Sequence, residues 1–521
     1  MITDFAGYGG AAAAGVLLAL SFPQYGHPAL SWIALTPLLV ALASARSMRR
    51  AFALGLLTGI LYFTGTLYWI TRVMAVYGGL QMWVAMLVNA ALIAYLALFP
   101  ALFALIVRRL ITVRGPYALM ASPLVWVATE LGRTHVFTGF PWVLLGYSQV
   151  SVLPVAQLAS VFGVYGVSAL VAAVSASLAL AAVVPGRPAR NRESGALRQR
   201  WGAVVAAVML VVGVAVWGSL RVSRGTLTKT GDPLRVGMIQ GNVPQDDKTN
   251  AARAPAIFQN HLRMTRQAIG EGARIVFWPE SSMPFMFEED GPAAAQVRAL
   301  ARETRVPLLF GSDQIEWREE NGQRLPDKYY NAAFLVRADG TTGGVYRKIH
   351  LVPFGEYVPL RRVFFFAAPL VEAVSDFTAG ADAVLLPVHG HLISTAICYE
   401  IVYPDLVRRF VRGGSELLTT ITNDAWFGRT SAPYQHFAQA AMRAIEEGRY
   451  LVRSANTGVS GIVDPYGHVL ASTDIFEPAV TVGEIRLLRT ATIYSVIGDV
   501  FAYASALFTA ALLIATRRRV K

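Results

Sequence analysis

The sequence of 521 residues has little charge and almost no cysteine. Charged residues make up 15% of the chain, whereas hydrophobic residues make up 54%. This balance excludes an ordinary soluble globule and a disordered chain, and it predicts that part of the chain is embedded in a membrane. Cys398 is the single cysteine, so an internal disulfide is excluded. The thiol is therefore either an inert core residue or a chemical reagent.

The chain also lacks the motifs that hold metals, nucleotides or nucleic acids. Its eight histidines show no His-x-x-x-His spacing, and no glycine-rich loop of the phosphate-binding type is present. We therefore expect no metal and no cofactor. The net charge of +13 comes largely from arginines beside apolar runs. Such arginines orient membrane spans, and no groove-reading motif accompanies them, so we expect no nucleic-acid binding.

Eight apolar runs of about 20 residues predict eight membrane-spanning helices. The first run has the length of a cleaved signal peptide, but its start, Met1-Ile2-Thr3-Asp4, lacks the positive charge that a signal needs. We therefore expect a retained span. The predicted spans are 6–23, 29–45, 51–73, 80–107, 116–131, 155–184, 203–220 and 493–515.

Basic residues are distributed unequally between the two sides of these spans. Short loops on one side carry only Arg72 and Arg133. By the positive-inside rule, both termini are cytoplasmic, and the long insert between the seventh and eighth spans faces outward. The fifteen basic residues on the cytoplasmic side are Arg46, Arg49, Arg50, Arg108, Arg109, Arg114, Arg187, Arg190, Arg192, Arg198, Arg200, Arg517, Arg518, Arg519 and Lys521.

Glu130 and Arg133 lie one helical turn apart near the end of the fifth run. Ionisable residues at membrane depth are candidates for a functional site. A mutual ion pair at the membrane interface is an equal alternative.

The insert at 233–488 has the pattern of a layered α/β domain, because β-like runs alternate with helix-like stretches. The turn-rich stretch 223–232 predicts a linker before it. The chain then divides into a transmembrane part at 1–222, an outward domain at 233–488, and a final span with a cytoplasmic tail at 489–521. The predicted strands are 234–239, 274–278, 306–311, 332–336, 391–397 and 417–421, and the predicted helices are 254–271 and 293–304.

Three reactive side chains follow β-like runs in this domain: Glu280, Lys348 and Cys398. Active sites of α/β proteins lie at the carboxyl edges of their strands. A thiol needs a base to become a nucleophile, and an attacked carbonyl oxygen needs a cation. Glu280 suits the first role and Lys348 the second, while the backbone N–H of Tyr399 is a candidate second donor. A surface salt bridge and a buried core thiol are the plainer alternatives.

A histidine base is also compatible with the composition of this region. The candidates are His350, His389, His391 and His436.

An ordered set of motifs resembles the nitrilase superfamily, and within it bacterial apolipoprotein N-acyltransferase. The set continues through Arg443–Arg449 and Arg453–Ser460 to Tyr494 and Gly498-Asp499. The main runs are Gly237-Met238-Ile239-Gln240-Gly241-Asn242-Val243-Pro244-Gln245, Trp278-Pro279-Glu280, Arg347-Lys348-Ile349-His350-Leu351-Val352-Pro353-Phe354-Gly355-Glu356-Tyr357-Val358-Pro359, Ile397-Cys398-Tyr399-Glu400, Thr422-Asn423-Asp424-Ala425-Trp426-Phe427-Gly428 and Gln435-His436.

The resemblance implies an αββα sandwich on an eight-helix membrane base in the bacterial inner membrane, with the sandwich in the periplasm. It also implies transfer of a fatty acyl chain from a phospholipid, typically phosphatidylethanolamine, to the N-terminal α-amine of a diacylglyceryl-cysteine lipoprotein. Residue by residue, Glu280 is then the base, Lys348 the oxyanion stabiliser and Cys398 the acyl carrier. The resemblance adds supporting roles for three further residues, which are Glu356, Tyr399 and Glu400. We expect a monomer.

The alternative within the same superfamily is a membrane-tethered amidase, which has the same trio but little use for eight spans. One position departs from the family pattern, because Lys248 is followed by Thr249-Asn250 where the family often has tryptophan. The apolar stretch at 363–370 is either core or a lid that dips into lipid.

Overall fold

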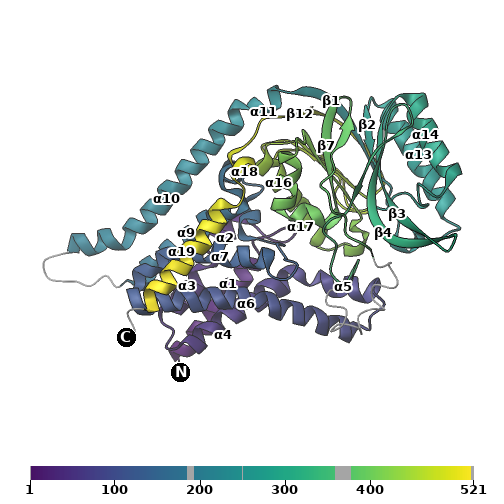
Figure 1. Cartoon of the computed structure of the whole chain (residues 1–521). Coiled ribbons are helices and arrows are strands. Elements are labelled where there is room, and N and C mark those ends of the chain that lie inside the picture. Colours follow the sequence, from purple (N-terminus) through teal and green to yellow (C-terminus); the bar gives the residue numbers. More distant parts are fainter. Residues whose placement is uncertain (1, 185–192, 249, 358–376, 518–521) are drawn as a thin grey trace. The chain divides into compact units, whose positions relative to one another are not determined.

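The computed structural model describes residues 2–184, 193–248, 250–357 and 377–517 (Figure 1). The chain forms two compact units. The first comprises Met1–Thr71, Met82–Arg224 and Ile497–Lys521, and the second comprises Arg72–Gln81 and Gly225–Val496. The predicted lid at 363–370 and Thr249 lie outside the described residues.

The first unit is helical, and five helices of the described chain are long and apolar enough to cross a membrane. Two shorter apolar helices, Phe5–Ala19 and Pro28–Ala43, accompany them. The five candidate spans are Met48–Leu67 (α4), Met82–Arg114 (α6), Ala159–Val183 (α9), Trp201–Lys229 and Val500–Arg517 (α19). The fourth of these combines most of α10 (Glu193–Arg224) with α11 (Thr226–Lys229). Gly163 has a non-helical backbone conformation inside α9.

The predicted count of eight spans is therefore not confirmed. The second predicted span is divided into two short helices, Ser31–Ala34 (α2) and Thr36–Ala43 (α3), with Pro37 at the start of the latter. The fifth is a 3-10 turn followed by Ser122–His135 (α7), which has 14 residues. At 1.5 Å per residue such a helix is about 21 Å long, which is shorter than the hydrocarbon core of about 30 Å.

Glu130 and Arg133 on α7 do not form the mutual ion pair that was one of the two predicted alternatives. Both are 3% exposed, and no ion pair joins them in the described chain. Arg133 instead donates from Nη1 to the carbonyl oxygen of Trp142 at 2.6 Å. Glu130 accepts the backbone N–H of Leu145 at 2.7 Å. The two side chains therefore fasten the loop that follows α7.

The second unit contains two six-stranded sheets with helices outside them (Figure 1). The strand order is β12-β1-β2-β3-β4-β5 in one sheet and β11-β10-β9-β8-β7-β6 in the other. The sheets contact each other through β1 with β9 and β10 with β12. Helices α13 (Ala254–Gly270) and α14 (Gly291–Thr304) cover the first sheet, and α16 (Pro404–Arg412) and α17 (Ala432–Glu447) cover the second. The predicted layered α/β domain is confirmed, and it contains two sheets.

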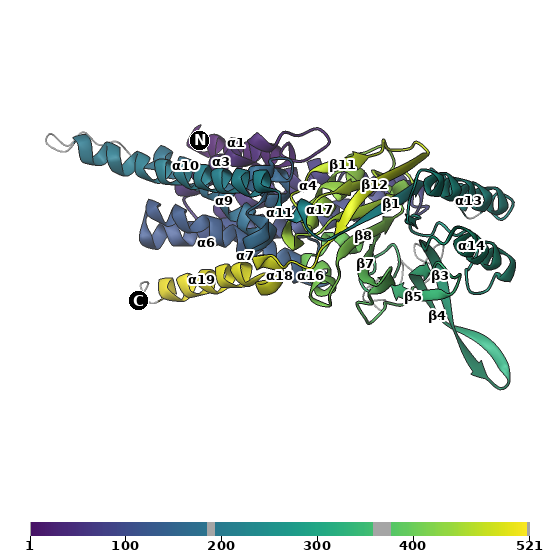
Figure 2. The same cartoon turned by 90° about the horizontal axis from the view of Figure 1, so that it is seen from above.

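The six predicted strands are present, with different lengths in some cases. The long β3–β4 hairpin extends beyond its sheet (Figure 2). The strands of the first sheet are β1 (Asp232–Gln240), β2 (Ile275–Phe277), β3 (Leu308–Glu320), β4 (Gln323–Val336), β5 (Thr342–Arg347) and β12 (Ala479–Leu487). Those of the second are β6 (Leu386–Val388), β7 (His391–Ile397), β8 (Leu417–Thr422), β9 (Leu451–Ala455), β10 (Gly461–Val463) and β11 (Val469–Ser472).

The predicted linker at 223–232 is wrong in part. Helix α10 continues to Arg224, and α11 occupies Thr226–Lys229, so only the residues after it are irregular before β1 begins.

The core between the first sheet and its two helices fixes the strands that carry the site. Phe258 and Leu262 on α13 and Val297 on α14 are buried against Phe310 of β3. Trp278, directly after β2, is also fully buried, and its indole N–H donates to the Thr265 hydroxyl at 2.8 Å. A buried tryptophan whose N–H has a partner anchors the chain strongly. The residues after Trp278 are therefore held in place.

Candidate active site

Each of the three predicted reactive residues directly follows a strand or lies close to its end. Glu280 comes after β2, Lys348 after β5 and Cys398 after β7. Strands β2 and β7 both have parallel neighbours, and carboxyl ends of parallel strands are where α/β proteins place their reactive groups. All three residues are buried, with exposures of 5%, 1% and 8%. The two facing sheets thus bring groups distant in sequence to one place.

The Glu280 carboxylate accepts three hydrogen bonds. Its Oε1 accepts from the Asn331 side-chain amide at 2.7 Å and from Lys348 Nζ at 3.3 Å, and its Oε2 accepts from the Asn423 backbone N–H at 2.8 Å. Burial acts to raise the pKa of Glu280, but Lys348 and these donors outweigh it and hold the pKa below its usual value. The carboxylate is ionised at neutral pH and ready to accept a proton.

The Lys348 ammonium lies between two carboxylates. Its Nζ is 2.8 Å from Glu356 Oε1 and 3.3 Å from Glu280 Oε1. Burial acts to lower the pKa of Lys348, yet the two carboxylates raise it well above its ordinary value. Glu356 is held in turn, because its Oε2 accepts the Val352 backbone N–H at 2.8 Å. Lys348 is therefore a fixed positive charge.

Cys398 occupies a strained backbone position. Its φ is 53°, in the left-handed region, at the first residue of the 3-10 turn Cys398–Val402 that follows β7. Non-glycine residues in this region carry backbone strain, and such residues gather at active sites. Burial, followed by the charge of Glu280, raises the pKa of the thiol well above its usual value, while Lys348 opposes the rise. The resting sulfur is therefore a thiol that needs a base.

Glu400 ties the Cys398 turn to the segment that carries Lys348. Its Oε1 accepts from the Tyr346 hydroxyl and from the backbone N–H groups of Ile349 and His350, and its Oε2 accepts from the Ile397 N–H at 2.7 Å. Burial raises the pKa of Glu400 to about 7, although the backbone N–H donors oppose the rise. Backbone N–H groups only donate, so the observed bonding favours the ionised carboxylate.

A second buried network lies behind Cys398. His436 Nε2 is 3.1 Å from the Cys398 carbonyl oxygen, and its Nδ1 is 3.0 Å from an Arg453 guanidinium nitrogen. Arg453 also donates to Asp424 at 2.8 Å. Burial, followed by the charge of Arg453, lowers the pKa of His436. The neutral ring thus supports the backbone of Cys398.

The other candidate histidines have different partners. The ring of His350 packs 3.7 Å from that of Tyr403. His389 contacts the Arg274 carbonyl oxygen, and His391 pairs with Glu416. Tyr399 packs its ring against Tyr403, with centroids 5.3 Å apart. Glu280 is therefore the base that the geometry favours.

Lys248 adds a second ammonium, whose place in this site was not predicted from the sequence. It ends the short helix α12 (Gln245–Lys248), and its Nζ donates to the carbonyl oxygens of Glu280 and Ser281 at 3.2 and 3.1 Å. Burial lowers the pKa of Lys248 to about 8, although Glu280 acts against it. Lys248 therefore holds the backbone turn at Glu280, where Ser281 has a φ of 44°.

Asn331 and Asn423 are the other contacts that sequence reasoning missed. Asn331 bridges Glu280 and Glu356, and Asn423 supplies a backbone N–H to Glu280. The sequence did contain a hint for Asn331, because this polar residue directly precedes the predicted apolar strand at 332–336. In the structure it lies on β4 and is buried. The role of Asn423 comes from its main chain, so its residue type carried no signal.

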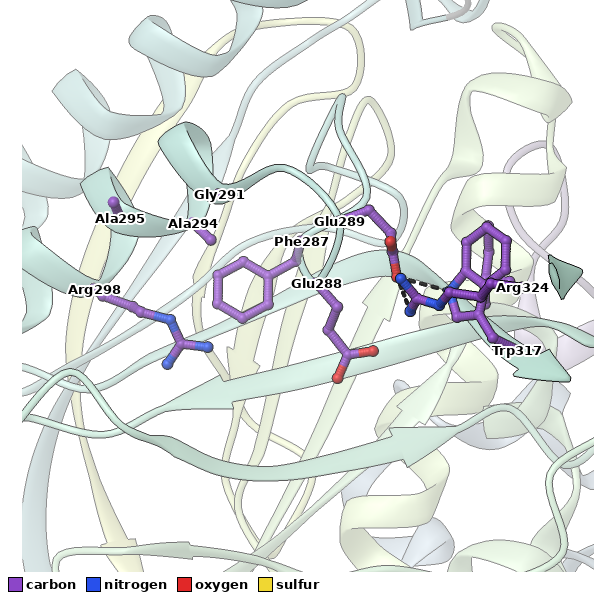
Figure 3. Close-up of a pocket in the computed structure, with 10 residues that line it drawn as sticks. Phe287, Glu288, Glu289, Gly291, Ala294, Ala295, Arg298, Trp317 and Arg324 are labelled. Atoms are coloured by element: carbon purple, nitrogen blue, oxygen red, sulfur yellow. Dashed lines mark hydrogen bonds and ion pairs between the residues drawn. The ribbon is translucent and has the colours of Figure 1, made fainter. Parts of the chain in front are cut away.

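A separate cavity of about 500 Å³ lies beside the β3–β4 hairpin (Figure 3). Arg324 binds Glu289 at 3.4 Å there and lies over the Trp317 ring. None of the proposed reactive residues lines this cavity. Within the described ranges, no group of three or more histidine, cysteine, aspartate or glutamate side chains is arranged to hold a metal ion.

The fold and the buried glutamate, lysine and cysteine define a carbon–nitrogen hydrolase-type enzyme class, and residues 235–494 match the family model named carbon-nitrogen hydrolase. Residues 14–177 match the model of the apolipoprotein N-acyltransferase N-terminal domain. The chain belongs to the apolipoprotein N-acyltransferase family.

Proteins that are similar to this chain over most of its length support its assignment to this family. The apolipoprotein N-acyltransferase of Geobacter metallireducens is 41% identical over 94% of this chain and 91% of its own. That of Methylococcus capsulatus is 36% identical over 93% and 91%. Among solved structures, an amidase from Nesterenkonia sp. is 21% identical over 50% of this chain and 93% of its own, with a TM-score of 0.37. Because residues 14–177 match the acyltransferase model and the two relatives above are acyltransferases over most of the chain, the amidase alternative is less supported.

Proposed function

We propose that this protein transfers a fatty acyl chain from a membrane phospholipid to the N-terminal α-amine of a diacylglyceryl-cysteine lipoprotein, through a thioester on Cys398. The observation that carries the proposal is the contact between ionised Glu280 and Lys348 in the same buried site as the Cys398 thiol, in a chain of this family. Phosphatidylethanolamine is the proposed donor.

In the first half-reaction, Glu280 takes the thiol proton as Cys398 sulfur attacks the ester carbonyl. The negative charge that develops on the carbonyl oxygen is stabilised by Lys348. A cation about 4 Å from such an oxyanion contributes about 4 kcal/mol at an effective dielectric near 20. The ester C–O bond then breaks, and Glu280 returns the proton to the departing lysophospholipid.

In the second half-reaction, the acceptor amine attacks the thioester carbonyl. A C–N bond forms, the C–S bond breaks, and Cys398 sulfur recovers a proton through Glu280. The high thiol pKa in the resting state, together with the low pKa of Glu280, means that the thiolate forms only as the oxyanion develops beside Lys348. This arrangement protects the enzyme from unwanted thiol reactions.

The proposed location follows from the loop charges and the family. The protein lies in the bacterial inner membrane as a monomer, with both termini cytoplasmic and the domain at 233–488 in the periplasm. Both substrates are lipid-anchored, so a site beside the periplasmic surface of the inner membrane suits them. Supporting roles are proposed for Glu356, which holds Lys348, for Glu400, which holds the Cys398 turn, and for Tyr399.

The test uses full-length protein with phosphatidylethanolamine vesicles and a synthetic diacylglyceryl-cysteine peptide. We expect the peptide to gain one acyl chain as an amide on its α-amine, as measured by mass spectrometry. Cys398→Ser and Glu280→Gln should abolish this gain. Ammonia release from small amides without peptide acylation would refute the proposal in favour of an amidase.

A further inference from the structure

Asp313 lies beside the proposed base, on the same face of the first sheet. In β3, an added side chain on Gly311 would come within 2.7 Å of Glu280 Cα, so this face of the strand is directed at Glu280. Asp313 is two residues further along and points to the same face. Its register partner on β4 is Asn331, whose amide contacts Glu280 and Glu356. Cross-strand partners share a face.

The Asp313 carboxylate has no hydrogen-bond or ion-pair partner among the residues that the structure describes. Its Oδ1 is fully enclosed and unpaired, although the residue as a whole is partly exposed. By contrast, Glu280 and Glu356 each accept three hydrogen bonds. Leaving an enclosed carboxylate without a donor is costly. Asp313 is therefore placed to accept from a group other than the described residues.

The charges around Asp313 indicate the sign of that group. The facing groups are the carboxylates of Glu280 and Glu356 and the ammonium of Lys248, with Lys348 between the two glutamates. Burial, followed by the charge of Glu280, raises the pKa of Asp313 to about 6, so the group is mostly ionised at neutral pH. Among the described residues, three carboxylates thus share two ammonium groups, so the charge balance of the site favours binding of one further cation.

We propose that Asp313 binds the α-ammonium group of the acceptor and places it beside Glu280 and the Cys398 thioester. This inference rests on the proposed function. A primary ammonium also occurs in the phosphatidylethanolamine headgroup. The acceptor is favoured because its nitrogen is the reacting atom and must reach Glu280, whereas the headgroup nitrogen is separated from the reacting ester by the phosphate and glycerol.

The proton balance of the step is complete. The bound ammonium loses one proton to Glu280, and the free amine attacks the thioester carbonyl. The C–N bond forms and the C–S bond breaks. The nitrogen then loses a second proton. Of these two protons, one ends on the sulfur of Cys398 and one leaves to solvent.

The test separates the two half-reactions in full-length Asp313→Asn, an isosteric change that removes the charge and turns one acceptor oxygen into an NH₂ group. Thioester formation on Cys398 is measured first, in vesicles of phosphatidylethanolamine and of phosphatidylglycerol. The acylated enzyme is then given either the diacylglyceryl-cysteine peptide or hydroxylamine. Asp313→Glu keeps the charge, and Asp327→Asn is the matched control, because Asp327 lies on β4 with exposed basic partners.

We expect Asp313→Asn to form the thioester at the wild-type rate from both lipids. Its KM for the peptide should rise about 10- to 100-fold, the range for a lost hydrogen bond to a charged group. Hydroxylamine is uncharged at neutral pH, so its reaction should not change. In Asp313→Glu, which keeps the charge, KM for the peptide should rise less than in Asp313→Asn. Asp327→Asn should have the wild-type KM.

An unchanged KM for the peptide would overturn the proposal, as would an equal loss with hydroxylamine. Slower thioester formation from phosphatidylethanolamine alone would overturn it in favour of the headgroup. If the proposed function itself is wrong, the wild-type enzyme will form no thioester on Cys398, and this result is distinct from any effect of the Asp313 variants.

Discussion

Replacing Glu400 by glutamine should slow acylation of Cys398, although Glu400 touches no substrate in the proposed mechanism. The carboxylate joins Ile397, the residue before the nucleophile, to Ile349, the residue after Lys348. Glutamine turns one acceptor oxygen into a donor NH₂ group. The better orientation keeps the amide oxygen toward Tyr346, Ile349 and His350, so the NH₂ group faces the Ile397 N–H and that bond is lost.

The size of the effect follows from the hydrogen bond removed. A hydrogen bond to a charged group contributes about 1.5–3 kcal/mol, and a buried N–H without a partner costs about 1–3 kcal/mol. We therefore expect a loss of about 2–5 kcal/mol in the free energy of unfolding. Displacing a reacting group by about 1 Å can cost about 100-fold in rate, so we expect Cys398 acylation to slow by about that factor.

The assay measures the rate of Cys398 acylation from phospholipid and the unfolding midpoint of the same preparation. Glu416→Gln is the control, because Glu416 is likewise buried, at 5% exposed against 0% for Glu400, and binds His391 and Arg489. This variant should lose comparable stability and keep its acylation rate. The reasoning is refuted if Glu400→Gln loses stability but acylates Cys398 as fast as the wild type.

Three further outcomes follow from the buried groups. Since Lys348 and its neighbours hold the pKa of Glu280 below its usual value of 4.5, the protonation of Glu280 that lowers kcat/KM for the first half-reaction should have its midpoint below pH 4.5, and a Glu280 midpoint above that value would contradict the assignment. Burial lowers the pKa of His261 to about 4. The unfolded state therefore binds more protons below about pH 6.5, and stability should fall by about 3 kcal/mol as the pH drops toward 4. His261→Gln should flatten that fall in denaturant titrations, and an unchanged slope would contradict the assignment. In Gly458→Ala, the added Cβ would lie 2.1 Å from Asp424 Oδ2, so the variant should unfold at lower temperature and acylate Cys398 more slowly, whereas wild-type behaviour would show that Asp424 can move freely.

The positions of Glu280 and Cys398 were predictable because each comes after an apolar strand, whereas β5 before Lys348 is not apolar and was not among the predicted strands. The runs before Glu280 and Cys398 correspond to β2 and β7, which are buried strands with parallel neighbours. The helices α13 and α14 were likewise found with boundaries that differ by one or two residues.

The missed features depend on contacts between distant segments. Strand β9 contains buried Arg453 and Ser454, which sequence patterns assign to a surface. Partners from distant segments, such as Asp424 for Arg453 and Ile239 for Ser454, make their burial possible. Asp313 sits on a strand that was predicted to end at 311. The count of membrane spans failed for another reason, since apolar runs that are broken by proline or by a 3-10 turn look continuous in composition.

The central claim is that Cys398 carries the acyl chain, and the mass of the intact enzyme tests it most directly. Wild-type protein incubated with a phospholipid of defined chains, without acceptor, should gain the mass of one acyl group. After proteolysis of the enzyme, that mass should be found on the fragment that contains Cys398. Hydroxylamine or the acceptor peptide should remove that mass, and Cys398→Ser should never acquire it. Acceptor acylation by Cys398→Ser, or an acyl group found on another residue of the wild type, would contradict the account.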